Sequence, residues 1–235
     1  MSAEEDLYES VYAVPLSCES CVNSVSKALG TVEGIKTFNV DLQKQQVSVE
    51  ASVAPSAIIQ AIQTTGRDAI IRGAGNLNSA AVCILESFAE EDSANPVRGL
   101  ARIVSVGPSK VLIDLSLNGL PKGTYFPTFR ASGNIWKGAL TTGDSILDLD
   151  PIAVDRPANG SFSGQYFIKA PASIADLVGR SMAISTAKGQ VFDGSLVGVI
   201  ARSAGVWEND KKVCSCTGKT VWQERADAVN KGITA

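Results

Sequence analysis

The spacing of hydrophobic positions changes repeatedly along the first 73 residues. Residues 9–15 form a strand-like apolar run, and residues 19–29 place Val22, Val25 and Leu29 at helical intervals. Alternating apolar positions then predict strands over 35–42 and 47–51, with a turn at Lys44-Gln45 between them. A second helix is expected to begin near Pro55, and a short strand at 69–71. The resulting order, β-α-β-β-α-β, predicts a ferredoxin-like α+β domain over 1–73.

The pattern after residue 73 is different. A Gly-rich linker at 74–77 is followed by short alternating strands, expected at 81–85, 99–106, 111–117 and 195–201, with a turn at Asn118-Gly119. This spacing indicates an all-β domain, a Greek-key sandwich or barrel, over 78–205. Residues 206–235 form a short tail, in which Thr220 and Gln223 have capping-box spacing and predict a helix.

Composition narrows the function classes. The chain has 235 residues, 45% of them hydrophobic, and a net charge of −3, so it can fill two cores and gives no support for a nucleic-acid partner. No apolar run approaches the roughly 18–20 residues of a membrane span, and the acidic start does not read as a signal peptide. We therefore expect reduced cysteines and a cytoplasmic protein, with the mitochondrial intermembrane space left open as a second location.

The sequence contains no histidine. This excludes an imidazole general base and every imidazole-bound zinc or copper site. A transition-metal site must therefore rest on sulfur or carboxylate. Four of the five cysteines form two close pairs, Cys18 with Cys21 and Cys214 with Cys216, which favours chemistry over structural disulfides.

Cys18 and Cys21 stand between the first predicted strand and the first predicted helix. Two thiols three residues apart at a helix start share one face of its first turn, where unsatisfied amide groups favour thiolate. Such a pair can bind a soft metal ion or exchange disulfides. The alternatives are incidental thiols or a thioredoxin-like redox pair, but the order of elements and the lack of a preceding Trp argue against the latter.

The segment Leu16-Ser17-Cys18-Glu19-Ser20-Cys21 resembles the Met-x-Cys-x-x-Cys motif of heavy-metal-associated domains. This resemblance implies Cu(I) held between two thiolates. Leu16 stands where the family usually has a packing Met, which is a mild change. Arg67 matches a basic residue beside the site in such domains, which implies that it offsets the charge of the copper–thiolate unit; a solvated surface charge is the alternative.

The second predicted domain resembles Cu,Zn superoxide dismutases, on Ala-Val-Cys-Ile-Leu-Glu at 81–86, Val-Arg-Gly-Leu-Ala at 97–101, Leu-Val-Gly-Arg-Ser-Met-Ala-Ile at 177–184 and Gly-Val-Ile-Ala at 198–201. The strand that carries a His-x-His pair in active dismutases reads Tyr-Phe-Pro-Thr-Phe-Arg at 125–130. We therefore expect a barrel with neither zinc nor dismutase activity. Cys83 matches a buried cysteine of that family and is interpreted as a core residue.

Dismutases pair through a self-complementary face that includes the C-terminal strand. The resemblance therefore implies an interface made by Gly198, Val199, Ile200, Arg202 and Trp207. For Val199 and Ile200, an ordinary place in the core is the alternative.

The second thiol pair, Cys214 and Cys216, is flanked by Lys211, Lys212 and Lys219, which favours thiolate. A disulfide within Cys-x-Cys is strained and easily passed on. The whole arrangement resembles the copper chaperones for superoxide dismutase, especially their fungal form. This implies a carrier that binds Cu(I), docks as a heterodimer on an immature dismutase subunit, delivers copper and promotes disulfide formation through Cys214 and Cys216.

Two other functions stay open on the sequence. One is a thiol–disulfide oxidoreductase that uses both cysteine pairs without delivering copper, and the other is a scaffold that only caps dismutase subunits. Three further points are left open. They are whether the free protein forms a homodimer, whether it takes copper from a source near a membrane, and which thiol pair passes copper to the client.

Overall fold

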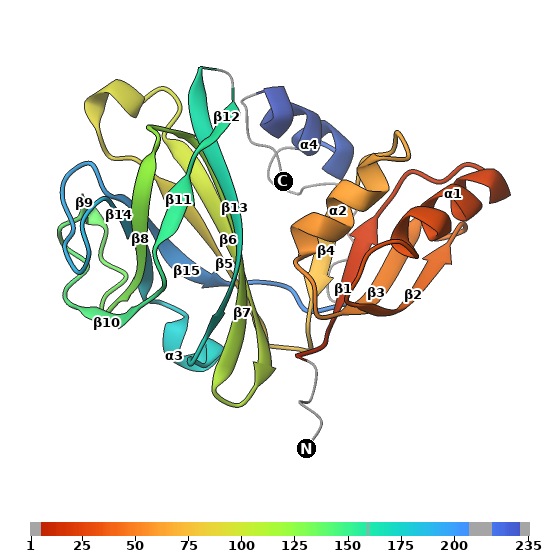
Figure 1. Cartoon of the computed structure of the whole chain (residues 1–235), viewed down its shortest axis with the longest axis horizontal. Coiled ribbons are helices and arrows are strands. Elements are labelled where there is room, and N and C mark those ends of the chain that lie inside the picture. Colours follow the sequence, from red (N-terminus) through yellow and green to blue (C-terminus); the bar gives the residue numbers. More distant parts are fainter. Residues whose placement is uncertain (1–5, 159, 207–217, 231–235) are drawn as a thin grey trace.

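The computed structural model describes residues 6–158, 160–206 and 218–230 and has two packed parts (Figure 1). The first is a four-stranded antiparallel sheet in the order β2-β3-β1-β4, which the two helices cover on one face. Its elements are β1 (Tyr8–Ala13), α1 (Glu19–Leu29), β2 (Ile35–Asp41), β3 (Gln46–Ala51), α2 (Pro55–Gln63) and β4 (Ile70–Ala74). The β-α-β-β-α-β prediction is confirmed, and β4 includes Ala74, which was expected in the linker.

The core of this domain lies between the sheet and the two helices. Val25 and Leu29 of α1, Ile58 and Ile62 of α2 and Val47 of β3 are fully buried there. Their helical and alternating spacings give each element one apolar face, which is why the sequence predicted these elements well.

The second part is an antiparallel barrel with its own core. Its strands are β5 (Ala80–Glu86), β6 (Val97–Gly107), β7 (Lys110–Leu120), β8 (Gly123–Arg130), β9 (Trp136–Ala139), β10 (Ser145–Asp148), β11 (Ile152–Val154), β12 (Arg156–Ala158), β13 (Ser161–Ala170), β14 (Ser181–Ser185) and β15 (Leu196–Arg202). Short helical turns η1 (Glu90–Asp92) and α3 (Ile174–Leu177) accompany them. Strand β7 runs through the turn expected at Asn118-Gly119 and ends at Leu120.

The strand connections have the Greek-key character that the sequence predicted. The hydrogen-bonded order is β8-β14-β15-β5-β6-β7-β13, so the chain crosses the barrel between β7 and β8 and again between β13 and β14. β11 pairs with β8, and β12 pairs with β13 directly after it. This continuous segment joins the two ends of the sheet and closes the barrel.

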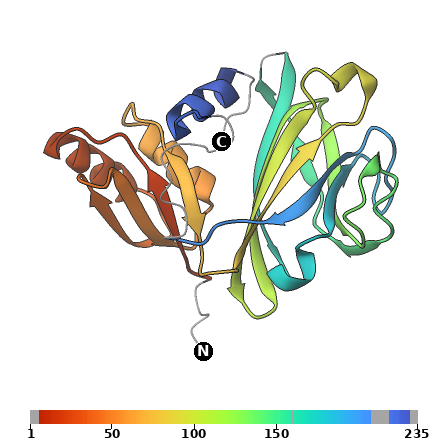
Figure 2. The same ribbon diagram turned by 180° about the vertical axis from the view of Figure 1, so that it is seen from behind.

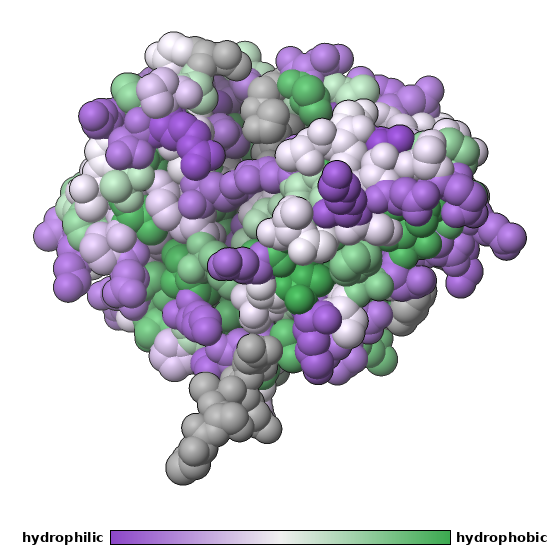
Figure 3. Space-filling model, turned by 45° about the vertical axis from the view of Figure 1, so that its right-hand side comes forward, coloured by the Kyte–Doolittle hydropathy of each residue, from purple (hydrophilic) through white to green (hydrophobic). Residues whose placement is uncertain are grey.

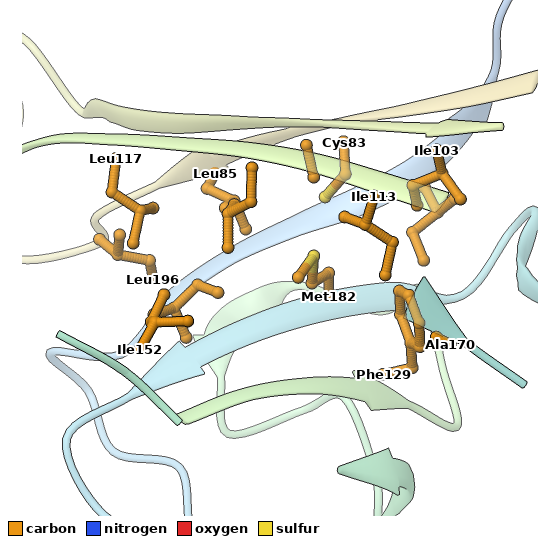
Figure 4. Close-up of a cluster of buried hydrophobic side chains, with 14 of the residues drawn as sticks. Cys83, Leu85, Ile103, Ile113, Leu117, Phe129, Ile152, Ala170, Met182 and Leu196 are labelled. Atoms are coloured by element: carbon orange, nitrogen blue, oxygen red, sulfur yellow. The ribbon is translucent and has the colours of Figure 1, made fainter. Parts of the chain in front are cut away.

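The interior of the barrel is apolar. Figure 4 shows Cys83, Met182 and Phe129 among the aliphatic side chains that meet between the strands. Phe129 is fully buried, and Arg130 beside it donates from Nε to Thr142 Oγ1 at 3.1 Å. The interpretation of Cys83 as a core residue is confirmed, since its side chain is also fully buried.

A buried polar contact fixes the first domain to the barrel. Ala54, the residue before α2, has no capping side chain, and the amide of Ser56 is therefore an unsatisfied donor. Asp114 of β7 supplies the acceptor: its Oδ2 accepts from Ser56 N at 3.0 Å and its Oδ1 accepts from Ser56 Oγ at 2.7 Å. Arg102 of β6 lies 3.5 Å from the same carboxylate. The barrel thus caps a helix of the neighbouring domain.

Apolar and charged contacts extend this interface. Tyr8 of β1 packs with Val104 and Leu112 of the barrel. The carboxylate of Asp6 accepts from Lys110 and Lys169, each at 2.8 Å. The two domains therefore share a mixed interface, part apolar and part ionic.

The chain returns to the first domain after β15 (Figure 2). Ala74 N donates to Ala204 O at 3.3 Å, and Val206 N donates to Gly75 O at 2.9 Å. A Cβ added at Gly73 would lie 2.1 Å from Gly205 O, so only glycine permits this approach of the two backbones. The exit of the barrel is joined to the last strand of the first domain.

Helix α4 (Val221–Asn230) follows the undescribed segment 207–217. Thr220 N donates to Gln223 Oε1 at 2.8 Å, and Gln223 N donates to Thr220 Oγ1 at 3.3 Å. The predicted capping box is therefore confirmed. No residue of α4 is buried, although its Arg225 forms an ion pair with Asp68 of the first domain at 3.0 Å.

The surface mixes polar and apolar residues. On the face in Figure 3, hydrophobic residues gather between hydrophilic ones in the lower half. Among the described residues, no helix has both the length and the apolar character needed to cross a membrane.

Candidate metal centre

The backbone brings Cys18 and Cys21 together. Cys18 is the N-cap of α1, in an extended conformation, and its carbonyl accepts from Cys21 N at 3.0 Å. The two Sγ atoms lie 3.5 Å apart. Cys18 is exposed and Cys21 is buried, so one sulfur is anchored in the domain and the other is open to an approaching partner.

Two serine hydroxyls, not predicted from the sequence, flank the sulfurs. Ser17 Oγ lies 3.3 Å from the Sγ of Cys21, and Ser20 Oγ lies 3.0 Å from that of Cys18. Hydrogen bonds from Ser17 and then from Arg67 lower the pKa of Cys21 to about 6. The hydrogen bond from Ser20 is the largest cause that lowers the pKa of Cys18. At neutral pH the site therefore favours thiolate, the form that binds metals.

Two contacts of Leu16 hold the loop before α1 in place. Leu16 is buried in the core of the domain, as expected for a residue that replaces a packing Met. Its carbonyl accepts from Gln45 Nε2 at 3.0 Å, and Gln45 has a positive φ of 52° in the β2–β3 turn. This side chain was also missed, because a turn residue gives no pattern that points to a distant loop.

Arg67 lies where the sequence placed it, in the loop after α2. Its Nη1 donates to Thr65 O at 2.8 Å, and a hydrogen bond from its side chain is one of the causes that lower the pKa of Cys21. The guanidinium therefore acts on the buried sulfur. Its role in offsetting the charge of bound copper stays a prediction.

The two sulfurs form a site of low coordination. Among the described residues, no group of three or more His, Cys, Asp or Glu side chains could hold a metal ion. At a metal–sulfur distance of roughly 2.3 Å, a linear S–metal–S unit needs sulfurs about 4.6 Å apart. Because the observed separation is 3.5 Å, the sulfurs would have to open by about 1 Å for a linear unit. The exposed Cys18 is the one free to move.

Cys83 has no part in this centre. Burial in the barrel raises the pKa of its thiol to about 12. It is therefore a neutral apolar side chain at physiological pH, with no thiolate to offer a metal ion.

The residues predicted for the partner interface differ in exposure. Val199 and Arg202 are exposed, whereas Ile200 is fully buried in the barrel core and Gly198 is buried against the carbonyl of Ile84. This corrects the assignment of Gly198 and Ile200 to an accessible surface, because both residues are buried within the barrel itself. For Ile200 the core alternative is right.

Ile84 of β5 was missed and belongs beside Val199. Its side chain is 52% exposed, and the register of β15 on β5, with Ile200 opposite Cys83, makes the two residues neighbours. Arg202 donates to Asn78 Oδ1 at 2.7 Å. Trp207, Cys214 and Cys216 lie outside the described residues.

Comparison with known proteins decides the family. Residues 11–68 match the heavy-metal-associated domain. The Superoxide dismutase 1 copper chaperone of Debaryomyces hansenii is 52% identical, over 96% of this chain and 98% of its own. That of Saccharomyces cerevisiae is 46% identical, over 97% and 98%. The chain belongs to the copper chaperones for superoxide dismutase.

Relatives outside the fungi match as well, and the match covers both domains. The copper chaperone for superoxide dismutase of Sus scrofa is 30% identical over 91% of this chain and 88% of its own. The resemblance noted in the sequence is thereby confirmed for both domains, and Cys18, Cys21 and Arg67 all lie within the heavy-metal-associated match. The copper-chaperone relatives do not favour the oxidoreductase alternative.

Proposed function

We propose that this protein captures Cu(I) with Cys18 and Cys21 and delivers it to an immature Cu,Zn superoxide dismutase subunit. The observation that carries the proposal is the pair of sulfurs 3.5 Å apart at the start of α1, with both pKa values lowered. Its curated relatives are named as copper chaperones for superoxide dismutase, which supports the client.

The ligand set supports Cu(I) over zinc. Thiolates are soft ligands, and structural zinc needs four of them or a mixture with imidazole. The chain has no histidine, and the described residues add no third ligand near the pair. A site with two sulfurs suits an ion that accepts two ligands, and incoming client thiolates can then replace the protein's own one at a time.

We further propose that the barrel docks on the dismutase subunit as a heterodimer, through a face that includes Val199, Arg202 and Ile84. Exposed apolar side chains on adjacent strands support such a face. Trp207 is proposed as part of it, and Cys214 and Cys216 as the thiols that carry copper onward or oxidise the client through a mixed disulfide. The protein is proposed to act in the cytoplasm, with the mitochondrial intermembrane space left open as a second location.

A competitive Cu(I) titration of the full chain against a chelator tests the capture step. Cys18→Ser and Cys21→Ser should each abolish tight binding, whereas Cys83→Ala, which removes a thiol outside the site, should not change it. Unchanged affinity in the first two variants would mean that copper is captured elsewhere.

Delivery needs a second experiment. The copper-loaded protein is mixed with metal-free, disulfide-reduced dismutase, and complex formation, metal transfer and client oxidation are followed together. A Val199→Glu variant should fail to form the heterodimer while its Cu(I) affinity is unchanged. Client oxidation without copper would instead favour the oxidoreductase function, and sedimentation of the free protein reports whether it pairs with itself.

A further inference from the structure

The loop between α2 and β4 carries two opposite charges on consecutive residues, Arg67 and Asp68. Neighbouring side chains of opposite charge are natural partners, yet among the described residues no ion pair joins these two. Arg67 instead donates from Nη1 to Thr65 O at 2.8 Å, and its side chain is one of the causes that lower the pKa of Cys21. Asp68 accepts from Gln63 Nε2 at 2.9 Å and from Arg225 Nε at 3.0 Å.

The partner of Asp68 comes from far along the chain. Arg225 lies on α4, 157 residues away, and its side chain is only 14% exposed in the ion pair. Burial of Asp68 works against ionisation, but the hydrogen bonds from Gln63 and Arg225 outweigh it and leave the pKa lowered. The carboxylate of Asp68 is therefore already paired with the guanidinium of Arg225 on α4.

Helix α4 is held in a way that permits release. None of its residues is fully buried, and its apolar residues Val221 and Trp222 are only half-buried, so apolar packing holds it less firmly than it holds a core helix. Its ion pair is only partly shielded, because the side chain of Asp68 is 34% exposed, so the pair should weaken with salt. The capping box of the helix, Thr220 with Gln223, is formed by residues of its own segment and involves no contact with the first domain.

We propose that α4 controls how firmly the thiol pair holds copper, because Arg225 occupies Asp68 and thereby leaves Arg67 to the sulfurs. This inference rests on the proposed capture of Cu(I) by Cys18 and Cys21. Two thiolates and one Cu(I) carry a net charge of −1, which a guanidinium stabilises. When α4 leaves, Asp68 loses its distant cation and competes with the sulfurs for the adjacent one.

The docked helix is thus the copper-retaining state and the released helix the copper-yielding state. Arg225 and Asp68 are positioning residues in this scheme, since neither touches the metal. The coupling is reciprocal: copper on the thiol pair must favour docking of α4 by the same factor by which docking favours copper.

Competitive Cu(I) titration of the full chain tests this scheme. Arg225→Gln should weaken Cu(I) affinity about fivefold, within the range of surface ion pairs and typical site coupling. Arg225→Lys, which keeps the cation, should retain most of the affinity. Lys36→Gln, which removes an equal charge from a pair with Glu50 on the same domain, serves as the control and should leave the affinity unchanged.

A double-mutant cycle distinguishes this mechanism from simple loosening of the loop. In an Asp68→Asn background the competitor is gone, so Arg225→Gln should have no further effect. In an Arg67→Gln background it should likewise have none. An equal loss in every background would mean that the helix acts through general stability and would overturn the proposed route.

The result also separates this inference from the function on which it rests. Unchanged affinity in Arg225→Gln, with loss of binding in Cys18→Ser and Cys21→Ser, refutes the role of α4 and leaves copper capture intact. Unchanged affinity in the cysteine variants refutes the proposed function itself.

Discussion

Ser56→Ala should loosen the contact between the two domains by a measurable amount. The hydroxyl is 2.7 Å from Asp114 Oδ1, and Ser56 is only 2% exposed, so water cannot readily replace the lost donor. A hydrogen bond to a buried charged acceptor is worth about 1.5–3 kcal/mol. Alanine regains up to roughly 0.7 kcal/mol through its better helix propensity. The expected net loss is about 1–2.5 kcal/mol.

Urea unfolding of the full chain measures this loss, together with the midpoint of thermal unfolding. For a protein of this size 1 kcal/mol shifts the melting temperature by about 2–4 °C, so the variant should melt about 2–10 °C lower. Ser24→Ala is the matched control, since its hydroxyl donates to Ser20 O on the exposed side of α1. That change should stay within about 0.5 kcal/mol of neutral.

A further variant tests whether the acceptor's charge is responsible. Burial raises the pKa of Asp114, although Arg102 and Ser56 both work against that rise. In an Asp114→Asn background the hydrogen bond from Ser56 joins neutral partners, and its loss should cost only about 1 kcal/mol. If Ser56→Ala proves as stable as Ser24→Ala, the hydrogen bond from the Ser56 hydroxyl to Asp114 contributes nothing and the reasoning fails.

Three other outcomes follow from the geometry. The alkylation rate of Cys21, measured by mass spectrometry, should reach half its maximum near pH 6. The reason is that its pKa is lowered from the ordinary value of 9.0, so thiolate forms at a lower pH. A midpoint near pH 9 would contradict the role of its hydrogen bonds. Gly198→Ala should destabilise the protein by about 2 kcal/mol or more in urea unfolding, because the new Cβ would lie 1.8 Å from Ile84 O. The control is Gly194→Ala, since Gly194 has open space around it. Equal stability of the two variants would argue against the close contact at Gly198. Thr220→Ala should weaken the capping box by about 1 kcal/mol and speed amide exchange in α4, and unchanged exchange would show that the cap is unimportant.

The first domain was predictable because its two helices and β3 each have one buried face. The apolar positions of α1 and α2 recur at helical intervals, and those of β3 alternate, so local spacing alone identifies the elements. Strands such as β9, β10, β11 and β12 have only three or four residues, which is too short for any period to be recognised. β10 and β11 pair with β8 and β12 pairs with β13, so the positions of these three strands are a property of the closed barrel.

The polar contacts between distant parts of the chain could not be predicted, for a different reason. Asp114 lies in an alternating strand, where a charged residue is expected to face water; here it faces the other domain. Asp68 and Arg225 are 157 residues apart, and nothing in either local pattern points to the other. The cysteine pair was found because its two members are close in sequence, whereas Gln45, which holds the loop before it, comes from a distant segment.

The seam between Gly73 and Gly205 has an evolutionary consequence. Although residues 204–206 follow the barrel in sequence, their backbone contacts the end of the first domain, at residues 73–75. Recombination that exchanged only the barrel would therefore remove the backbone hydrogen bonds that this segment makes with the first domain. The two modules are expected to be inherited and to diverge as a matched pair, with the glycine at each side of the crossing retained together.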